Sequence, residues 1–192
     1  MLDKEPSNNK KVLITGASGF LGSHVADSLT KSGYEVTVFD CVESPFLQKS
    51  QEMVVGSILN YEELNTTVKG CDYVYHFAGI ADIGESSKNP EKTISVNIIG
   101  TQNVLKASVE NKVKRIVFAS TIYVYSHLGS FYRVSKQACE KLIEEYAREF
   151  SLPYTILRFG SLYGPRANTF NSINNMLKQA METNNITRRC EH

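Results

Sequence analysis

The residues KVLITGASGFLG, 11–22, give the clearest indication of the fold. Lys11–Thr15 is a short apolar run typical of a buried strand, and Phe20–Lys31 has apolar residues at helical spacing. Glycines between them permit a tight turn and a close backbone approach to a pyrophosphate, whose charge is stabilised by free N–H groups at a helix N-terminus. The residues expected to line this turn are Gly16, Ser18, Gly19, Phe20, Leu21 and Gly22.

The alternation of strand and helix continues along the chain. Further strands are expected at 35–40, 52–56, 72–79, 114–120 and 154–160, and further helices at 61–68, 90–111, about 131–150 and 171–182. Near-continuous apolar strands separated by helix-length segments are what a parallel sheet covered on both faces requires. The sequence therefore predicts an α/β fold, a doubly wound parallel sheet of Rossmann type. We place this domain at 11–187, after a disordered leader (1–10) and before a short tail (188–192).

Composition excludes several classes of protein. The chain has 192 residues, 42% apolar and 21% charged, as in one ordinary globular domain. Its net charge of +1 argues against a nucleic-acid or membrane-surface partner. The N-terminus lacks an apolar core, and no apolar run approaches the roughly 20 residues that span a bilayer, so we expect a cytoplasmic protein. The four cysteines are far apart without metal-site spacing, which predicts reduced thiols and no metal site.

Asp40 ends the second expected strand, about 20 residues beyond the glycines. At that spacing a carboxylate can accept hydrogen bonds from both hydroxyls of an adenosine ribose. It would repel a 2′-phosphate, and the following Cys41-Val42-Glu43 offers no arginine to pair with one. The pattern favours NAD over NADP as the cofactor.

Tyr132 and Lys136 lie four residues apart near the start of an expected helix, so both side chains share one helix face. A free tyrosine has a pKa near 10 and is a poor base at neutral pH. A nearby ammonium favours the phenolate and moves that pKa toward the working range. The pair predicts an acid/base site.

Several motifs occur together in a fixed order: GASGFLG (16–22), Asp40, HFAGIADIGES (76–86), SVNIIGT (95–101), FASTIYVY (118–125), YRVSK (132–136) and LRFGSLYGPR (157–166). This series resembles that of the extended short-chain dehydrogenases/reductases, the group that contains the nucleotide-sugar epimerases. The resemblance covers roughly residues 10–180. A whole series in the right order is far more specific than any one motif.

The resemblance implies roles for particular residues. Tyr132 would be the acid/base, Lys136 would lower its pKa and hold the nicotinamide ribose, and Thr121 would hydrogen-bond the reacting sugar oxygen. Ser57 and Ile58 occupy the place of residues that contact adenine, although the family usually has an aspartate at the first position. The other positions that match residues lining the cofactor are Phe77, Ala78, Gly79, Asn97, Ser120 and Phe159.

The resemblance also suggests the reaction. Sugar 4,6-dehydratases typically carry Asp-Glu directly after the catalytic threonine, whereas this chain has Ile122-Tyr123, which favours an NAD-dependent nucleotide-sugar epimerase or simple oxidoreductase. Family members also commonly form homodimers through a four-helix bundle, made here by helices 90–111 and 131–150. They continue with more than a hundred residues that recognise the nucleotide-sugar, and that lobe is missing here. A non-catalytic NAD-binding module is therefore the alternative function.

Overall fold

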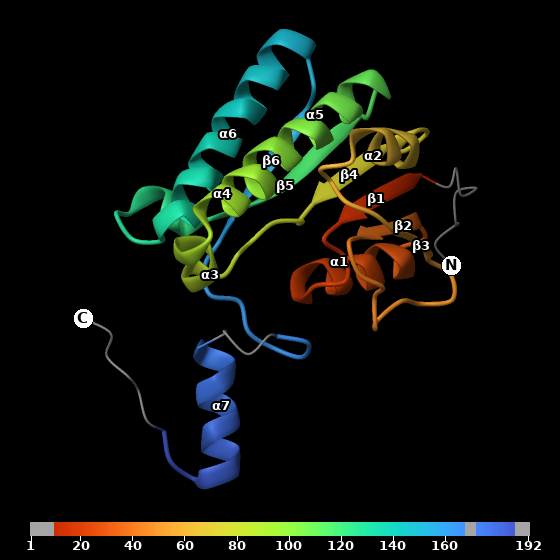
Figure 1. The fold of residues 1–192 in the computed structure, drawn as a ribbon. Coiled ribbons are helices and arrows are strands. Elements are labelled where there is room, and N and C mark those ends of the chain that lie inside the picture. The colour runs from red at the N-terminus through yellow and green to blue at the C-terminus, as the bar shows by residue number, and fades with distance from the viewer. Residues whose placement is uncertain (1–9, 168–171, 187–192) are drawn as a thin grey trace, which may run out of the picture.

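The computed structural model describes residues 10–167 and 172–186, in which one parallel sheet is flanked by helices (Figure 1). The strands are β1 (Lys11–Thr15), β2 (Glu35–Asp40), β3 (Glu52–Val55), β4 (Tyr73–His76), β5 (Arg115–Thr121) and β6 (Tyr154–Phe159). The helices are α1 (Phe20–Lys31), α2 (Tyr61–Val68), α3 (Ile83–Lys88), α4 (Pro90–Thr93), the π-helix η1 (Ile94–Ile99), α5 (Gly100–Glu110), the 3₁₀-helix η2 (Ile122–Tyr125), α6 (Ser130–Phe150) and α7 (Ser172–Thr183).

The six strands lie in the order β3-β2-β1-β4-β5-β6, and every neighbouring pair is parallel. The strand order reverses direction between β1 and β4. In open α/β sheets, ligands bind at the carboxyl ends of the strands beside such a reversal. The order confirms the predicted doubly wound sheet and places the end of β1, with its glycine turn, at the reversal.

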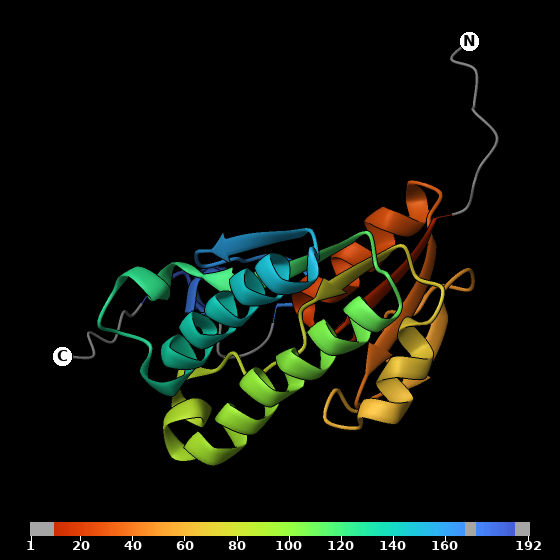
Figure 2. The ribbon, with the colours of Figure 1, turned by 90° about the horizontal axis from the view of Figure 1, so that it is seen from above.

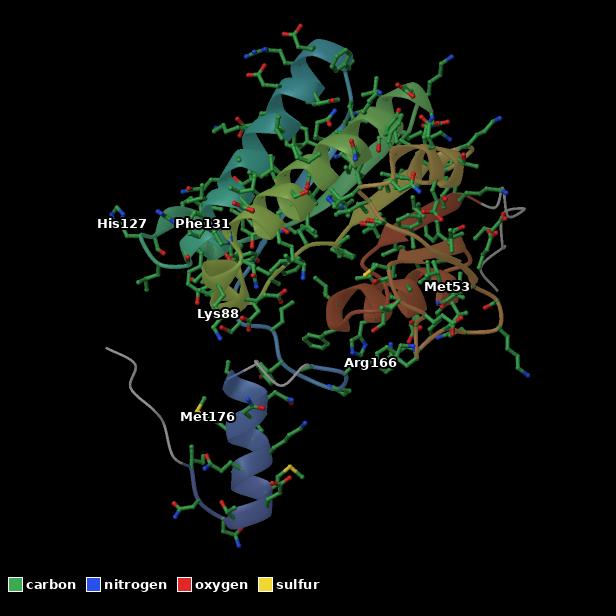
Figure 3. All side chains as sticks on the ribbon, viewed as in Figure 1. Met53, Lys88, His127, Phe131, Arg166 and Met176 are labelled. Carbon is green, nitrogen blue, oxygen red and sulfur yellow. The ribbon has the colours of Figure 1, made fainter. Side chains whose placement is uncertain are left out.

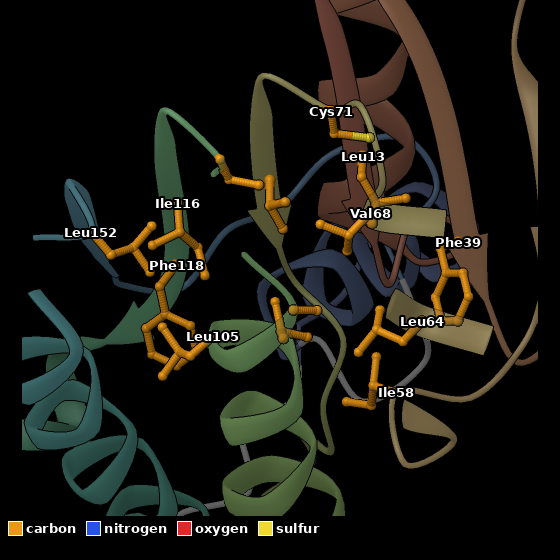
Figure 4. Close-up of a cluster of buried hydrophobic side chains, with 14 of the residues drawn as sticks. Leu13, Phe39, Ile58, Leu64, Val68, Cys71, Leu105, Ile116, Phe118 and Leu152 are labelled. Carbon is orange, nitrogen blue, oxygen red and sulfur yellow. The ribbon is translucent and has the colours of Figure 1, made fainter. Parts of the chain in front are cut away.

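Helices pack on both faces of the sheet, as its apolar strands require. On one face α2, α5 and α6 enclose the larger core, which contains Leu13, Leu105 and Phe118 (Figures 2 and 4). On the other face α1 packs through Ala26 against a smaller cluster from β1 and β2 that includes Ile14. Alternate strand residues point to opposite faces, so both sets become buried.

The expected helix over 90–111 is interrupted. The chain is helical from Pro90 to Glu110, but Ile94–Ile99 forms a π-helix between α4 and α5. Within it the Asn97 carbonyl accepts hydrogen bonds from Thr101 Oγ1 (2.5 Å) and Cys139 Sγ (3.1 Å). Single π-helical turns inside α-helices are frequent at functional sites.

A short helix that the sequence analysis did not anticipate, α3, precedes this segment. Asp82 caps its first turn, because the Asp82 carboxylate accepts a hydrogen bond from Glu85 N at 2.6 Å. An aspartate followed three residues later by a glutamate is a helix-start signal, so this sequence did contain a clue.

The expectations for the leader and the tail concern residues that, except for Lys10, lie outside the described parts of the chain. The expected last helix is present as α7, which lies apart from the sheet (Figure 1). Across the residues described, none of the helices combines the length and apolar character needed to cross a bilayer. A cytoplasmic location stays a prediction.

Candidate active site

The glycine turn leaves no room for side chains at its ends. Gly16 has φ +73°, and a Cβ built there would lie 2.4 Å from Ala78 N and 2.6 Å from the Phe77 carbonyl carbon. A Cβ on Gly22 would lie 2.4 Å from Gly16 O. Real Cβ atoms essentially never approach backbone so closely. Glycine is therefore required here so that β1, the start of α1 and the end of β4 can meet.

The N-terminus of α1 is open to an anion. Its N-cap residue is Gly19, which supplies no side-chain hydrogen bond, and the first turn contains no acidic residue. No acidic residue in the first turn of the helix therefore offsets the positive end of its dipole. This arrangement fits the pyrophosphate of a dinucleotide.

Asp40 lies beside this turn, as its spacing predicts. Its Oδ2 accepts a hydrogen bond from Ser18 N at 2.9 Å, and Ser18 Oγ donates to Val42 O at 2.9 Å. These bonds fix the glycine turn to the end of β2. A carboxylate so placed fits the hydroxyls of an adenosine ribose next to a pyrophosphate.

Asn97 joins the loop after β4 to α6. It is 2% exposed; its Oδ1 accepts from Ile80 N at 2.7 Å, and its Nδ2 donates to Ile80 O and to Ser135 Oγ. Gly79 lies against it, because a Cβ there would be 3.0 Å from Asn97 Oδ1. The π-helical turn therefore places a fully satisfied amide between the β4 loop and the helix that carries Tyr132 and Lys136.

His76 is fully buried at the end of β4, and its hydrogen bonds define its tautomer. Thr101 Oγ1 donates to Asn97 O, so that hydroxyl can only accept from His76 Nε2 (2.9 Å). In the neutral ring Nδ1 must then accept from Thr15 Oγ1, at 2.7 Å. The resulting chain of hydrogen bonds joins the residue before Gly16 to the π-helix. His76 is therefore a structural residue with no free nitrogen for acid/base work.

Acid should destabilise the fold through His76. Burial, with a smaller contribution from the charge of Lys136, lowers the pKa of His76 from 6.5 to about 3. Between these pH values the unfolded chain binds a proton that the folded chain excludes, so this contribution to stability is lost as the pH falls below 6.5. At pH 4.5 the loss is roughly 2 to 3 kcal/mol.

Urea unfolding at pH 7.5 and pH 4.5 measures this effect. We expect His76→Gln to be less stable at pH 7.5, because it disrupts buried hydrogen bonds, but to lose less stability on acidification than the unsubstituted protein. His127→Gln, which alters an exposed histidine, is the control and should leave the pH dependence unchanged. Equal pH dependence for His76→Gln and the unsubstituted protein would contradict the assignment of a neutral, buried ring.

Tyr132, Thr121 and Lys136 come together at the carboxyl end of β5. Thr121 is the last residue of that strand, and Tyr132 lies on the first turn of α6, near enough for the two side chains to interact. Lys136 lies one turn further along the helix and is 5% exposed. The ammonium nitrogen of Lys136 lies 5.9 Å from the centroid of the Tyr132 ring and donates to Ala119 O at 2.8 Å.

The pKa values of this group differ from the sequence-based expectation. Burial raises the pKa of Tyr132, and the hydrogen bond from Thr121 offsets this only in part. Burial has the opposite effect on Lys136, because it disfavours the charged ammonium and lowers the pKa to about 8. The negative charge of Glu140 opposes this shift but does not cancel it. The expected lowering of the tyrosine pKa by Lys136 is absent, because the two groups are not in direct contact and the phenol is desolvated.

The sequence analysis missed an ion pair one turn beyond Lys136 on α6, between the buried carboxylate of Glu140 and the exposed side chain of Arg158. Glu140 accepts hydrogen bonds from Arg158 Nε (3.0 Å) and Nη2 (2.7 Å), and also from Ser120 Oγ at 2.5 Å. Burial alone would raise the pKa of Glu140, but these bonds outweigh it and leave the pKa lowered. Lys136 and Glu140 are four residues apart, which places them on one helix face. The partner of Glu140 is Arg158 on β6, which lies 18 residues further along the chain, so no local pattern predicted this pair.

The other residues predicted to line the cofactor differ in their position and burial. Phe159 pairs in register with Thr121, so it lies at the same sheet edge. Phe77 and Ala78 follow β4 and are partly buried against the two cores. Ile58 is buried against Gly100, and its carbonyl accepts from Asn103 Nδ2 at 3.0 Å; Ser57 Oγ accepts from Leu59 N. Cofactor contacts at Ser57, Ile58 and these other positions stay predictions.

The parallel sheet, the glycine turn at the strand reversal and the carboxylate after β2 define a Rossmann-type domain of the dinucleotide-binding class. The model of the NAD dependent epimerase/dehydratase family matches residues 12–188, and the chain belongs to this family. The resemblance inferred from the motif series is thereby confirmed.

Known relatives and structures agree with this membership. A UDP-N-acetyl-alpha-D-glucosaminuronate decarboxylase from Bacillus cytotoxicus is 32% identical, over 82% of this chain and 56% of its own length. UDP-glucose 4-epimerase from Thermotoga maritima, solved with UDP-glucose, has a TM-score of 0.85 at 29% identity, covering 89% of this chain and 63% of that one. UDP-glucuronic acid 4-epimerase from Bacillus cereus, in complex with UDP-glucuronic acid and NAD, has a TM-score of 0.80 at 30% identity. The match covers 90% of this chain and 63% of that one.

The chain spans just over half the length of the curated relatives it matches. Residues 12–188, which the family model matches, include all the motifs quoted above.

Proposed function

We propose that the chain binds NAD and carries the catalytic residues of a nucleotide-sugar epimerase or related sugar oxidoreductase. The observation that carries the proposal is the meeting of Thr121, Tyr132 and Lys136 at the carboxyl end of β5. The glycine turn and Asp40 lie at the same edge of the sheet. Family membership and the NAD-bound epimerase from Bacillus cereus support the cofactor.

In this proposal the glycine turn and the N-terminus of α1 hold the pyrophosphate, and Asp40 holds the adenosine ribose. Bound NAD supplies the acceptor for a hydride from the sugar carbon. Tyr132 takes the proton of the sugar hydroxyl, and Thr121, whose proximity acts to lower the pKa of Tyr132, stabilises the phenolate and orients the sugar oxygen. Lys136, one turn further along α6, holds the nicotinamide ribose.

The test is to incubate the purified protein with NAD and a panel of UDP-, GDP- and dTDP-sugars. Nucleotide-sugar products are followed by chromatography, and NADH is followed by its absorbance. We expect NAD binding together with epimerisation or oxidation of at least one sugar. NAD binding without any turnover would reject the catalytic function of this chain and leave a non-catalytic NAD-binding module.

The alternative function is a non-catalytic NAD-binding module. The chain covers 55–56% of the length of the decarboxylase and of one UDP-glucose 4-epimerase that it matches. The sugar panel separates the two functions.

A homodimer through α5 and α6 is part of the same proposal. Among the small and apolar residues of these two helices, Val104 and Ala107 on α5 are fully buried against the chain's own core, whereas Val134 on α6 is 46% exposed. Ile94 and Ile99, on η1, are also exposed. The support for a dimer therefore comes from α6 and the π-helix rather than from the inward face of α5.

A further inference from the structure

The segment Gly160–Ala167, which we call the return segment, leads from the edge of the sheet back to α1. It begins directly after β6, whose last residue, Phe159, pairs with Thr121. Near its other end the Pro165 carbonyl lies 2.9 Å from His24 Nε2 on α1. A carbonyl only accepts, so this nitrogen of His24 carries the hydrogen and donates it.

Arg166 makes the second and third contacts of the return segment. Its Nη2 lies 2.8 Å from Asp27 Oδ2, and both side chains are about three-quarters buried. The guanidinium also lies 4.5 Å from the centroid of the Phe46 ring, a cation–π contact, and Figure 3 shows Arg166 beside α1. Arg166 has φ +68°, which costs free energy in a residue with a side chain, so these contacts hold a strained backbone in place.

The residues of α1 that contact the return segment lie next to the glycine turn. Phe20, His24 and Asp27 share one helix face, and the rings of Phe20 and His24 meet edge to face at 5.6 Å. Phe20 is itself a residue of the glycine turn. The return segment thus runs from the end of β5, where the nicotinamide is expected, to the N-terminal part of α1, where the central pyrophosphate of NAD is expected.

Each side chain of the Asp27–Arg166 ion pair also has one polar atom without a hydrogen-bond partner. Asp27 Oδ1 and Arg166 Nη1 are both buried without a hydrogen-bond partner. Buried polar atoms without partners are rare in folded proteins and call for an explanation. At this position they leave an acceptor and a donor available when a ligand lies between the return segment and α1.

We propose that the return segment is a clasp that retains NAD, with His24, Asp27 and Arg166 as its positioning residues. The inference rests on the proposed NAD binding and deepens it. A dinucleotide that extends from the phosphate turn to the end of β5 leaves only when the contacts to α1 open. AMP, which is held by Asp40 and the turn alone, does not extend that far.

The experiment compares variants of the ion pair by calorimetric titration with NAD and, separately, with AMP. Asp27→Asn and Arg166→Met should each weaken NAD binding about tenfold and leave AMP binding within about twofold. The double variant should be no weaker than either single variant, because both remove the same contact. Arg166→Lys, which keeps the charge but loses the planar guanidinium, should lie between Arg166→Met and the unsubstituted protein.

The matched control is Asp72→Asn. Asp72 pairs with Lys114 at 2.6 Å and is 21% exposed, close to the 23% of Asp27, but it lies at the amino ends of the strands. If the unsubstituted protein does not bind NAD, the proposed function fails and the clasp fails with it. If it binds NAD but the Asp27 and Arg166 variants behave like Asp72→Asn, or lose AMP and NAD equally, the clasp is overturned while NAD binding stands.

Discussion

Tyr132→Phe should lower the rate of sugar oxidation by NAD about 10³-fold while changing NAD affinity by less than about twofold. The substitution removes only the hydroxyl, so the ring continues to pack beside Thr121. Without the hydroxyl, Lys136 cannot replace Tyr132 as the base, because its ammonium has no lone pair and donates to Ala119 O. The loss should therefore appear in the chemical step rather than in cofactor binding.

Single-turnover formation of NADH, with saturating NAD and an active sugar from the panel, measures this step. Tyr146→Phe is the matched control, because it makes the same change on the same helix, at a residue whose hydroxyl accepts from Gln102 Nε2 away from the site. It should retain the full rate. Turnover by Tyr132→Phe at the unsubstituted rate would refute the assignment of Tyr132 as the acid/base.

Gly16→Ala should abolish measurable NAD binding and lower the free energy of unfolding by roughly 3 to 4 kcal/mol. The added Cβ would overlap Ala78 N and the Phe77 carbonyl carbon, which are backbone atoms fixed by the pairing of β1 with β4. A further cost arises from φ +73°, which disfavours alanine. Relief requires the turn to move away from the end of β4, and this displaces the N–H groups that would bind pyrophosphate.

Gly70→Ala separates these two costs. Gly70 has a similar φ of +80°, but a Cβ there meets nothing within 4 Å. Urea unfolding should show a loss of only about 1 kcal/mol for this variant, with NAD affinity unchanged. If both variants lose the same stability, backbone strain alone explains the effect and crowding at Gly16 does not contribute.

Most of the fold and several residues of the candidate site could be predicted from local sequence patterns. The glycine turn, Asp40 and the Tyr132–Lys136 spacing are contiguous or periodic patterns, and each predicted its place at the carboxyl edge of the sheet. The structure differs from these expectations where a contact joins distant segments. The π-helical turn around Asn97 is an example, since its carbonyl is bound by Cys139, which lies 42 residues away.

The electrostatics of the site also depend on distant contacts. Proximity on one helix face suggested that Lys136 lowers the pKa of Tyr132. In the folded chain the ammonium is instead bound to Ala119 O, and burial raises the pKa of the phenol. Desolvation depends on all the atoms packed around a group, so the four-residue spacing of Tyr132 and Lys136 does not predict it.

The alternating strand and helix pattern, the parallel sheet and the glycine turn could be predicted from the sequence, because backbone conformation and hydrophobic period are local properties. The tautomer of His76, the Glu140–Arg158 ion pair and the contact of Arg166 with Asp27 became visible only in the folded chain. In each of these the partners are separated by 18 to 139 residues. Their pairing follows from how the whole sheet brings the segments together, and no local pattern records it.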